Sequence, residues 1–187
     1  AVYREASEIS RAAVEQCKQA VLLHTTETMS TSLNWNWSGM AFQKHADYLV
    51  KMVEAQQAGK TMLAAGYREA AKASYKQAEQ WKQSAEIKIA QKGIEGVSFD
   101  YAAISLAELS EYQVRAAEAQ EAGKTALAAS YREVVETYQK AAEQLQESAL
   151  AYAAGNEGEY ARLFNEAVFT KQKAEEMVKR VEENIGH

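Results

Sequence analysis

The sequence repeats itself at an interval of 64 residues. The stretch VKMVEAQQAGKTMLAAGYREAAKASYKQAEQW, which begins at Val50, returns as VRAAEAQEAGKTALAASYREVVETYQKAAEQL from Val114. The triplet Tyr-Arg-Glu keeps the same interval and begins at Tyr3, Tyr67 and Tyr131. A fixed interval of this length is the signature of one supersecondary unit whose copies bury their apolar faces against one another. The repeat therefore restricts the chain to an array of similar units.

The composition indicates that these units are helical. The 187 residues include no proline, and the repeat is rich in alanine, glutamate, glutamine and lysine, which are strong helix formers. Glycine is the strongest helix breaker that remains, and Gly59 and Gly123 occupy equivalent places in the two copies. Each glycine is expected to end one helix and start the next through a left-handed C-cap.

These turns, together with three longer joints, predict an all-α fold of antiparallel long helical hairpins, arranged as a helical bundle or a short α-solenoid. The expected organisation is a single helical repeat domain over residues 1–187, and residues 33–94 should superpose on 97–158. Its half-repeats at the two ends leave room for further repeats in the full-length chain. The six expected helices cover about 2–29, 37–58, 61–92, 100–122, 125–154 and 159–185. The expected units are a half-repeat 1–30, the repeats 31–94 and 95–158, and a half-repeat 159–187.

Apolar residues recur at steps of three and four along the longer helices, as in a heptad seam. The seam predicts that Tyr67, Trp81, Tyr131 and Leu145 are mostly buried. Near the C-terminus, the segment GNEGEYARLFNEAV spaces its aromatic residues in a way that loosely resembles tetratricopeptide repeats. The likeness covers about 14 residues, and the 64-residue interval is nearly twice that family's repeat of about 34. We attribute the likeness to shared packing physics and assign no family.

Several function classes find no support in the sequence. The net charge of −5 is spread without basic runs, which argues against nucleic acid as a partner. No stretch approaches 18 consecutive apolar residues, so no membrane span is expected. The motif Ala-Gly-Lys-Thr begins at Ala58 and Ala122, but a phosphate-binding P-loop needs a further glycine where Glu54 and Glu118 stand. Cys17 takes the repeat position of Trp81 and Leu145, which predicts a buried structural thiol.

The first hairpin departs most from its copy and supplies the candidate partner-binding residues. Trp35, Trp37 and His45 stand where the next repeat has an aromatic pair and a leucine. An exposed tryptophan pair in a loop would be a binding anchor, because aromatic residues dominate interface hot spots. Alternatively, both indoles cap the end of the bundle and pack against the first helix.

A second hypothesis concerns two histidines of this hairpin. If the turn is centred near residue 32, antiparallel pairing brings His45 to within about one helical turn of His24. Two imidazoles so placed could hold a metal or flank a haem. Neither histidine has a carboxylate or thiol at chelating spacing, however, and partly buried histidines with ordinary hydrogen bonds are the simpler interpretation.

The sequence therefore favours a non-enzymatic helical repeat module that serves as a protein-interaction or structural scaffold for a protein partner. The alternative is a helical bundle that binds a small molecule, haem or metal at the His24/His45 end. An enzyme is the least favoured class, because clustered glutamate and lysine on helices are usually solvated faces and no catalytic residue set stands out. No cofactor is expected, and the sequence does not predict a location in the cell.

Overall fold

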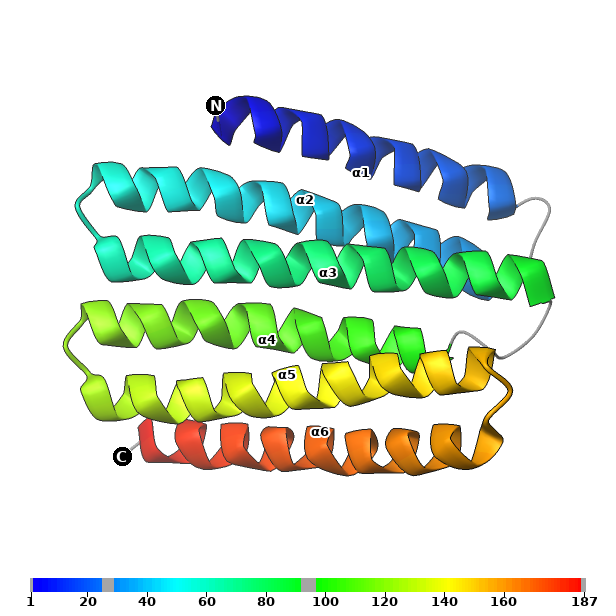
Figure 1. The fold of residues 1–187 in the computed structure, drawn as a ribbon. Coiled ribbons are helices and arrows are strands. Elements are labelled where there is room, and N and C mark those ends of the chain that lie inside the picture. Colours follow the sequence, from blue (N-terminus) through cyan, green and yellow to red (C-terminus); the bar gives the residue numbers. More distant parts are fainter. Residues whose placement is uncertain (1, 25–28, 92–96, 186–187) are drawn as a thin grey trace.

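The computed structural model describes residues 2–24, 29–91 and 97–185. These residues form six helices and no strand, so the all-α prediction is confirmed for the described chain. Each helix packs chiefly against the helices that precede and follow it in the sequence. Neighbouring helices run antiparallel, and α1 and α6 form the two edges of the array (Figure 1). The helices are α1 (Val2–His24), α2 (Met29–Gln57), α3 (Thr61–Gln91), α4 (Val97–Glu121), α5 (Thr125–Ala153) and α6 (Glu157–Ile185).

The two predicted glycine turns have the same backbone conformation. Gly59 and Gly123 have φ angles of +72° and +73°, in the left-handed region where a side chain is strained. At the first turn, the amide of Lys60 donates to the carbonyl of Ala55 at 2.9 Å. The second turn repeats this bond over 2.8 Å, between Lys124 and Ala119. Both turns are Schellman caps, in which the chain reverses within three residues.

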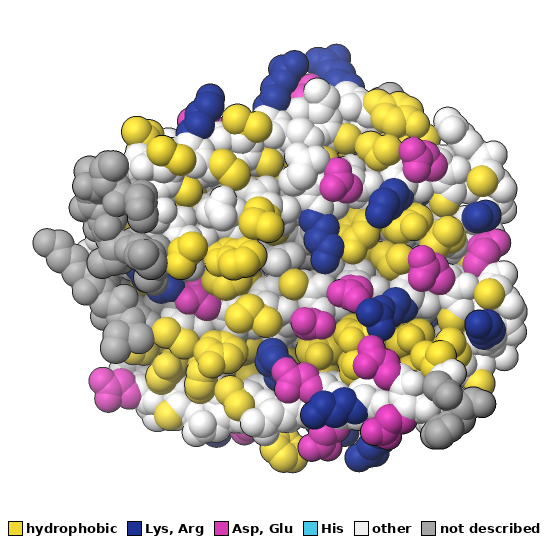
Figure 2. Space-filling view, turned by 180° about the vertical axis from the view of Figure 1, so that it is seen from behind, with side chains coloured by type: hydrophobic (Ala, Val, Ile, Leu, Met, Phe, Trp, Pro, Cys, Tyr) yellow, Lys and Arg dark blue, Asp and Glu magenta, His cyan; other side chains and the backbone are white. Residues whose placement is uncertain are grey.

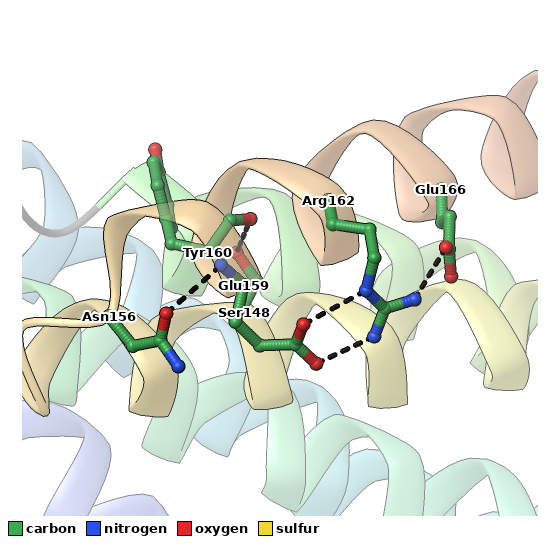
Figure 3. Close-up of polar contacts among 6 residues, drawn as sticks. All are labelled: Ser148, Asn156, Glu159, Tyr160, Arg162 and Glu166. Carbon is green, nitrogen blue, oxygen red and sulfur yellow. Dashed lines mark hydrogen bonds and ion pairs between the residues drawn. The ribbon is translucent and has the colours of Figure 1, made fainter.

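A third turn of this kind joins α5 to α6. Gly155 has a φ angle of +73°, and the amide of Asn156 donates to the carbonyl of Ala151 at 2.9 Å. The side-chain oxygen of Asn156 then accepts from the amide of Glu159 at 3.2 Å and caps the start of α6 (Figure 3). One asparagine thus ends one helix and starts the next.

The largest departures from the predicted helix boundaries lie where α1 ends and α2 begins. Helix α2 begins at Met29, eight residues before the expected start at 37, and α1 ends at His24. The polar segment around residues 26–39 suggested a loop, but within it Ser32 and Asn34 bond to other helices. Ser32 Oγ donates to the carbonyl of Ala20 on α1 at 2.8 Å, so it does not compete for the backbone of its own helix.

The core is built from alanine with interleaved aromatic rings, and each larger cluster draws on three or more consecutive helices. Tyr48 stacks on Tyr67 with ring centroids 6.0 Å apart, and Tyr112 stacks on Tyr131 at 5.9 Å. Among the four residues predicted to be mostly buried, Tyr67 is partly buried and the other three are buried. The superposition of residues 33–94 on 97–158 stays a prediction.

The array exposes more surface than a compact protein of its mass. Its accessible surface is 10320 Å², whereas a folded monomer of 20.7 kDa is expected to expose about 8,900 Å². Helices that contact mainly their chain neighbours leave both broad faces of the array to solvent. On the face seen in Figure 2, hydrophobic side chains gather in patches between charged ones. Among the described residues, no helix has the length and apolar character needed to cross a membrane.

Candidate functional site

The predicted tryptophan pair lies within α2, where one indole is buried and the other is partly exposed. Trp35 is only 9% exposed and packs between Ala20 of α1 and Ala85 of α3. Trp37 is 44% exposed and stacks on Trp81 of α3, with centroids 6.2 Å apart and ring planes at 28°. Of the two alternatives, an exposed pair in a loop is wrong, because both indoles lie within α2 and Trp35 is buried where three helices meet. The alternative of two packed indoles holds for Trp35 alone. Trp37 keeps one ring face open.

His45 is a buried link between two helices. It is 9% exposed, and its Nδ1–H donates to the carbonyl of Ala71 on α3 over 2.7 Å. The ring also meets Tyr75 edge to face, with centroids 5.5 Å apart. Burial lowers the pKa of His45, although the bond to Ala71 and the charge of Glu5 act in the opposite direction. His45 is therefore a neutral packing residue that does not face solvent.

The two histidines are not brought together. His24 is the last residue of α1, whereas His45 lies 16 residues after Met29, the first residue of α2, which is about 24 Å along the helix. The expected pairing is wrong because α1 ends at His24 and α2 begins at Met29, so residue 32 lies within α2 and is not the centre of a turn. Within the described residues, no group of three histidine, cysteine or acidic side chains could hold a metal ion. The arrangement offers nothing to support the haem or metal alternative.

An apolar groove lies between α1 and α2. It is open along one side and is lined almost entirely by apolar side chains, with Lys18 and Gln43 at its margin. Val14 and Val21 are 54% and 70% exposed, and Leu22 is similarly open. The lining residues are Ala13, Val14, Cys17, Lys18, Val21, Leu22, Gly39, Met40 and Gln43.

Gly39 forms the floor of this groove by allowing α1 and α2 to approach closely. A Cβ atom at this position would lie 2.7 Å from Cys17 Sγ and 2.9 Å from the carbonyl oxygen of Ala13. Cys17 is only partly buried and lines the groove, so the prediction of a buried thiol is wrong. Trp81 on α3 and Leu145 on α5 occupy the repeat position of Cys17, and each is covered by the preceding helix. Cys17 has no such cover among the described residues, because α1 is at the edge of the array.

Next to the groove, α2 presents a short apolar stripe. Leu33, Trp37 and Met40 are all exposed and are spaced by four and three residues, so they share one face of the helix. Met40 belongs to both the stripe and the groove lining. The groove and the stripe therefore form one continuous apolar surface, which we call the α1–α2 surface.

A polar network behind this surface joins α2, α3 and α4. Lys88 Nζ lies 2.7 Å from Asp100 Oδ2, and the lysine side chain is only 9% exposed. Asn34 Nδ2 donates to Asp100 Oδ1 at 2.9 Å and to Ser84 Oγ at 2.8 Å. Sequence reasoning missed this network, because its members are 4 to 66 positions apart. The sequence carried one sign of the network: Asn34, Lys88 and Asp100 each differ from the residue 64 positions later.

No protein-family model matches the sequence, and neither a curated protein nor a solved structure is similar enough to count as a match. The geometry of the described residues therefore carries the functional argument.

Proposed function

We propose that this chain is a non-enzymatic helical repeat module that acts as a protein-interaction or structural scaffold, with the α1–α2 surface as its binding face. The observation that carries the proposal is the continuity of exposed apolar side chains from Val14 and Val21 on α1 to Met40 and Trp37 on α2. Contiguous apolar patches on monomeric proteins commonly mark interaction sites. The other edge of the array, α6, carries mainly charged residues on its exposed side.

The three residues expected to bind a partner have different parts in this proposal. Trp37 is the contact residue, since its ring is open to solvent on one side. Its stacking on Trp81 restricts the indole before a partner arrives, which lowers the entropy lost on binding. Trp35 and His45 lie behind the surface and position α2 against its neighbours.

The test compares partner capture by matched variants. The purified chain serves as bait in an extract of the cells that produce it, beside the double variant Trp37→Ala/Met40→Lys. The control is Phe169→Ala, which removes an exposed aromatic residue from α6. We expect the double variant to lose the captured protein and the control to retain it. Equal capture by all three proteins, or equal loss in both variants, would contradict the proposed binding face.

A further inference from the structure

The groove between α1 and α2 corresponds to a position that a helix fills elsewhere in the same array. On α3, helix α2 fills it: Ser38 Oγ donates to the carbonyl of Ala78 at 2.9 Å, and Trp37 stacks on Trp81. On α5, helix α4 fills the matching position: Ala102 packs against Leu145. In both cases the covering helix runs antiparallel to the helix it covers (Figure 1).

The residues of α1 that match these covered positions are open to solvent. Val14 stands 64 residues before Ala78, and Val21 stands 64 residues before Ala85. Both alanines are fully buried, whereas both valines are more than half exposed. At these two places the edge helix thus carries larger apolar side chains than the covered helices do. Burial of apolar side chains is favourable, so a helix packed on α1 would be stabilised by covering both valines.

Helix α6 is the opposite edge, and it does not fit the groove of a second copy. At the positions where α4 places Ala102, Leu109 and Tyr112 against α5, α6 has Glu166, Lys173 and Glu176, all exposed. Arg162 pairs with Glu159 at 2.6 Å and with Glu166 at 2.6 Å, which ties these charges to one another (Figure 3). Such a face closes the array in the manner of a polar capping repeat. Head-to-tail stacking of copies would remove these paired charges from water against an apolar groove, at a desolvation cost that exceeds what their mutual attraction returns.

We infer that the groove between α1 and α2 binds an amphipathic helix of a partner polypeptide, which lies antiparallel to α1 in the way that α2 lies on α3 and α4 on α5. The partner helix carries small or apolar residues at steps of three and four, as α4 does at Ala102, Ser105 and Leu109. This inference rests on the proposed scaffold function and adds the chemistry and direction of the partner.

The inference is tested with a synthetic peptide of residues 97–121, the sequence of α4, labelled with a fluorophore. Its binding to the full chain is measured by fluorescence anisotropy, beside a peptide of residues 157–185, the sequence of α6. We expect the α4 peptide to bind at least tenfold more tightly than the α6 peptide. The variant Val14→Lys/Val21→Lys should bind the α4 peptide at least tenfold more weakly than the natural chain does. Because both valines are exposed, the variant should keep its helical circular dichroism.

The direction of the bound helix and the identity of the molecule that fills the groove are tested separately. A nitroxide at the N-terminus of the α4 peptide should broaden resonances near the C-terminal end of α1 more than those near Val2. Equal binding of the two peptides, or an unchanged affinity in the double variant, would overturn the inference. So would a dimer in sedimentation velocity that the double variant abolishes, because a second copy would then fill the groove. If protein capture succeeds while the α4 peptide fails to bind, the scaffold proposal survives and the helical occupant does not.

Discussion

At the scale of single residues, glycine determines how closely helices approach in this array. A Cβ atom at Gly66 on α3 would lie 2.3 Å from the Cβ of Ala117 on α4. Gly66→Ala should therefore destabilise the protein by about 1–3 kcal/mol through overpacking, although alanine favours helix by about 1 kcal/mol over glycine. Chemical denaturation measures the loss.

Two variants control this prediction. Gly158→Ala on α6 meets no atom within 4 Å and should be neutral or slightly stabilising. Adding Ala117→Gly to Gly66→Ala moves the methyl group to the other helix and should recover part of the loss. If Gly66→Ala were as stable as Gly158→Ala, the close approach of α3 and α4 would not constrain this position.

His45 makes the stability depend on pH. Burial lowers its pKa in the folded state below the ordinary 6.5, so the unfolded state binds more protons as the pH falls below that value. The stability that His45 contributes is present above about pH 6.5 and is lost as the pH falls toward the folded-state pKa, by at most about 1.4 kcal/mol per pH unit. Unfolding of the natural chain and of His45→Leu should be compared from pH 7.5 to 5.0. Parallel pH profiles would show that His45 is not the titrating group.

At the scale of elements, the network around Asp100 connects three helices at one end of the array. The Lys88–Asp100 pair is largely buried, so removing one charge leaves the other without its partner. Lys88→Met and Asp100→Asn should each destabilise by about 1–3 kcal/mol. The double variant should cost less than the sum, with a coupling energy of about 0.5–3 kcal/mol. A coupling energy near zero in this cycle would mean that the pair contributes only as two separate side chains.

The elements themselves could be predicted because their signals are local. The glycines at the two Gly-Lys turns and the three-and-four apolar spacing are visible within a few residues, and those helix boundaries agree with the structure to within one residue. The start of α2 was not predictable in this way. Asn34 bonds to Ser84 and Asp100, which lie 50 and 66 positions away. Without knowledge of such distant partners, a run of short polar side chains is typical of a loop.

The candidate site shows the same contrast between local signals, which the sequence reveals, and contacts between distant residues, which it does not. The departure of the first hairpin from its copy drew attention to α2, where the exposed alternative describes Trp37 and the packed alternative describes Trp35. Because the turn between α1 and α2 was expected near residue 32, the predicted pairing of residues across the two helices was shifted. That shift produced the incorrect prediction that His24 and His45 lie close together. The groove was missed because Val14 and Val21 look like ordinary core residues. Only their place at the edge of the array distinguishes them from the alanines at matching positions.

At the scale of the whole molecule, the array has one apolar edge and one charged edge. Helix α6 packs on α5 through Leu163, Ala167 and Val178, which leaves its charged side outward. An open repeat array with two complementary edges would polymerise, since head-to-tail interfaces do not close on themselves. The charges of α6 thus limit how copies associate, while the α1–α2 surface remains available.

This asymmetry can be reversed by design. Replacing Glu166→Ala, Lys173→Leu, Glu176→Tyr and Arg180→Ala gives α6 the residues that α4 uses against α5. The outward side of α6 should then fit the groove of the next copy, and sedimentation velocity should show oligomers that grow with concentration. Adding Val14→Lys and Val21→Lys should abolish these oligomers, because the groove would no longer accept an apolar helix. A charge-swapped control, Glu166→Lys with Lys173→Glu, should stay monomeric. If the four-residue variant remains a monomer at high concentration, the groove does not recognise helices of the α4 type.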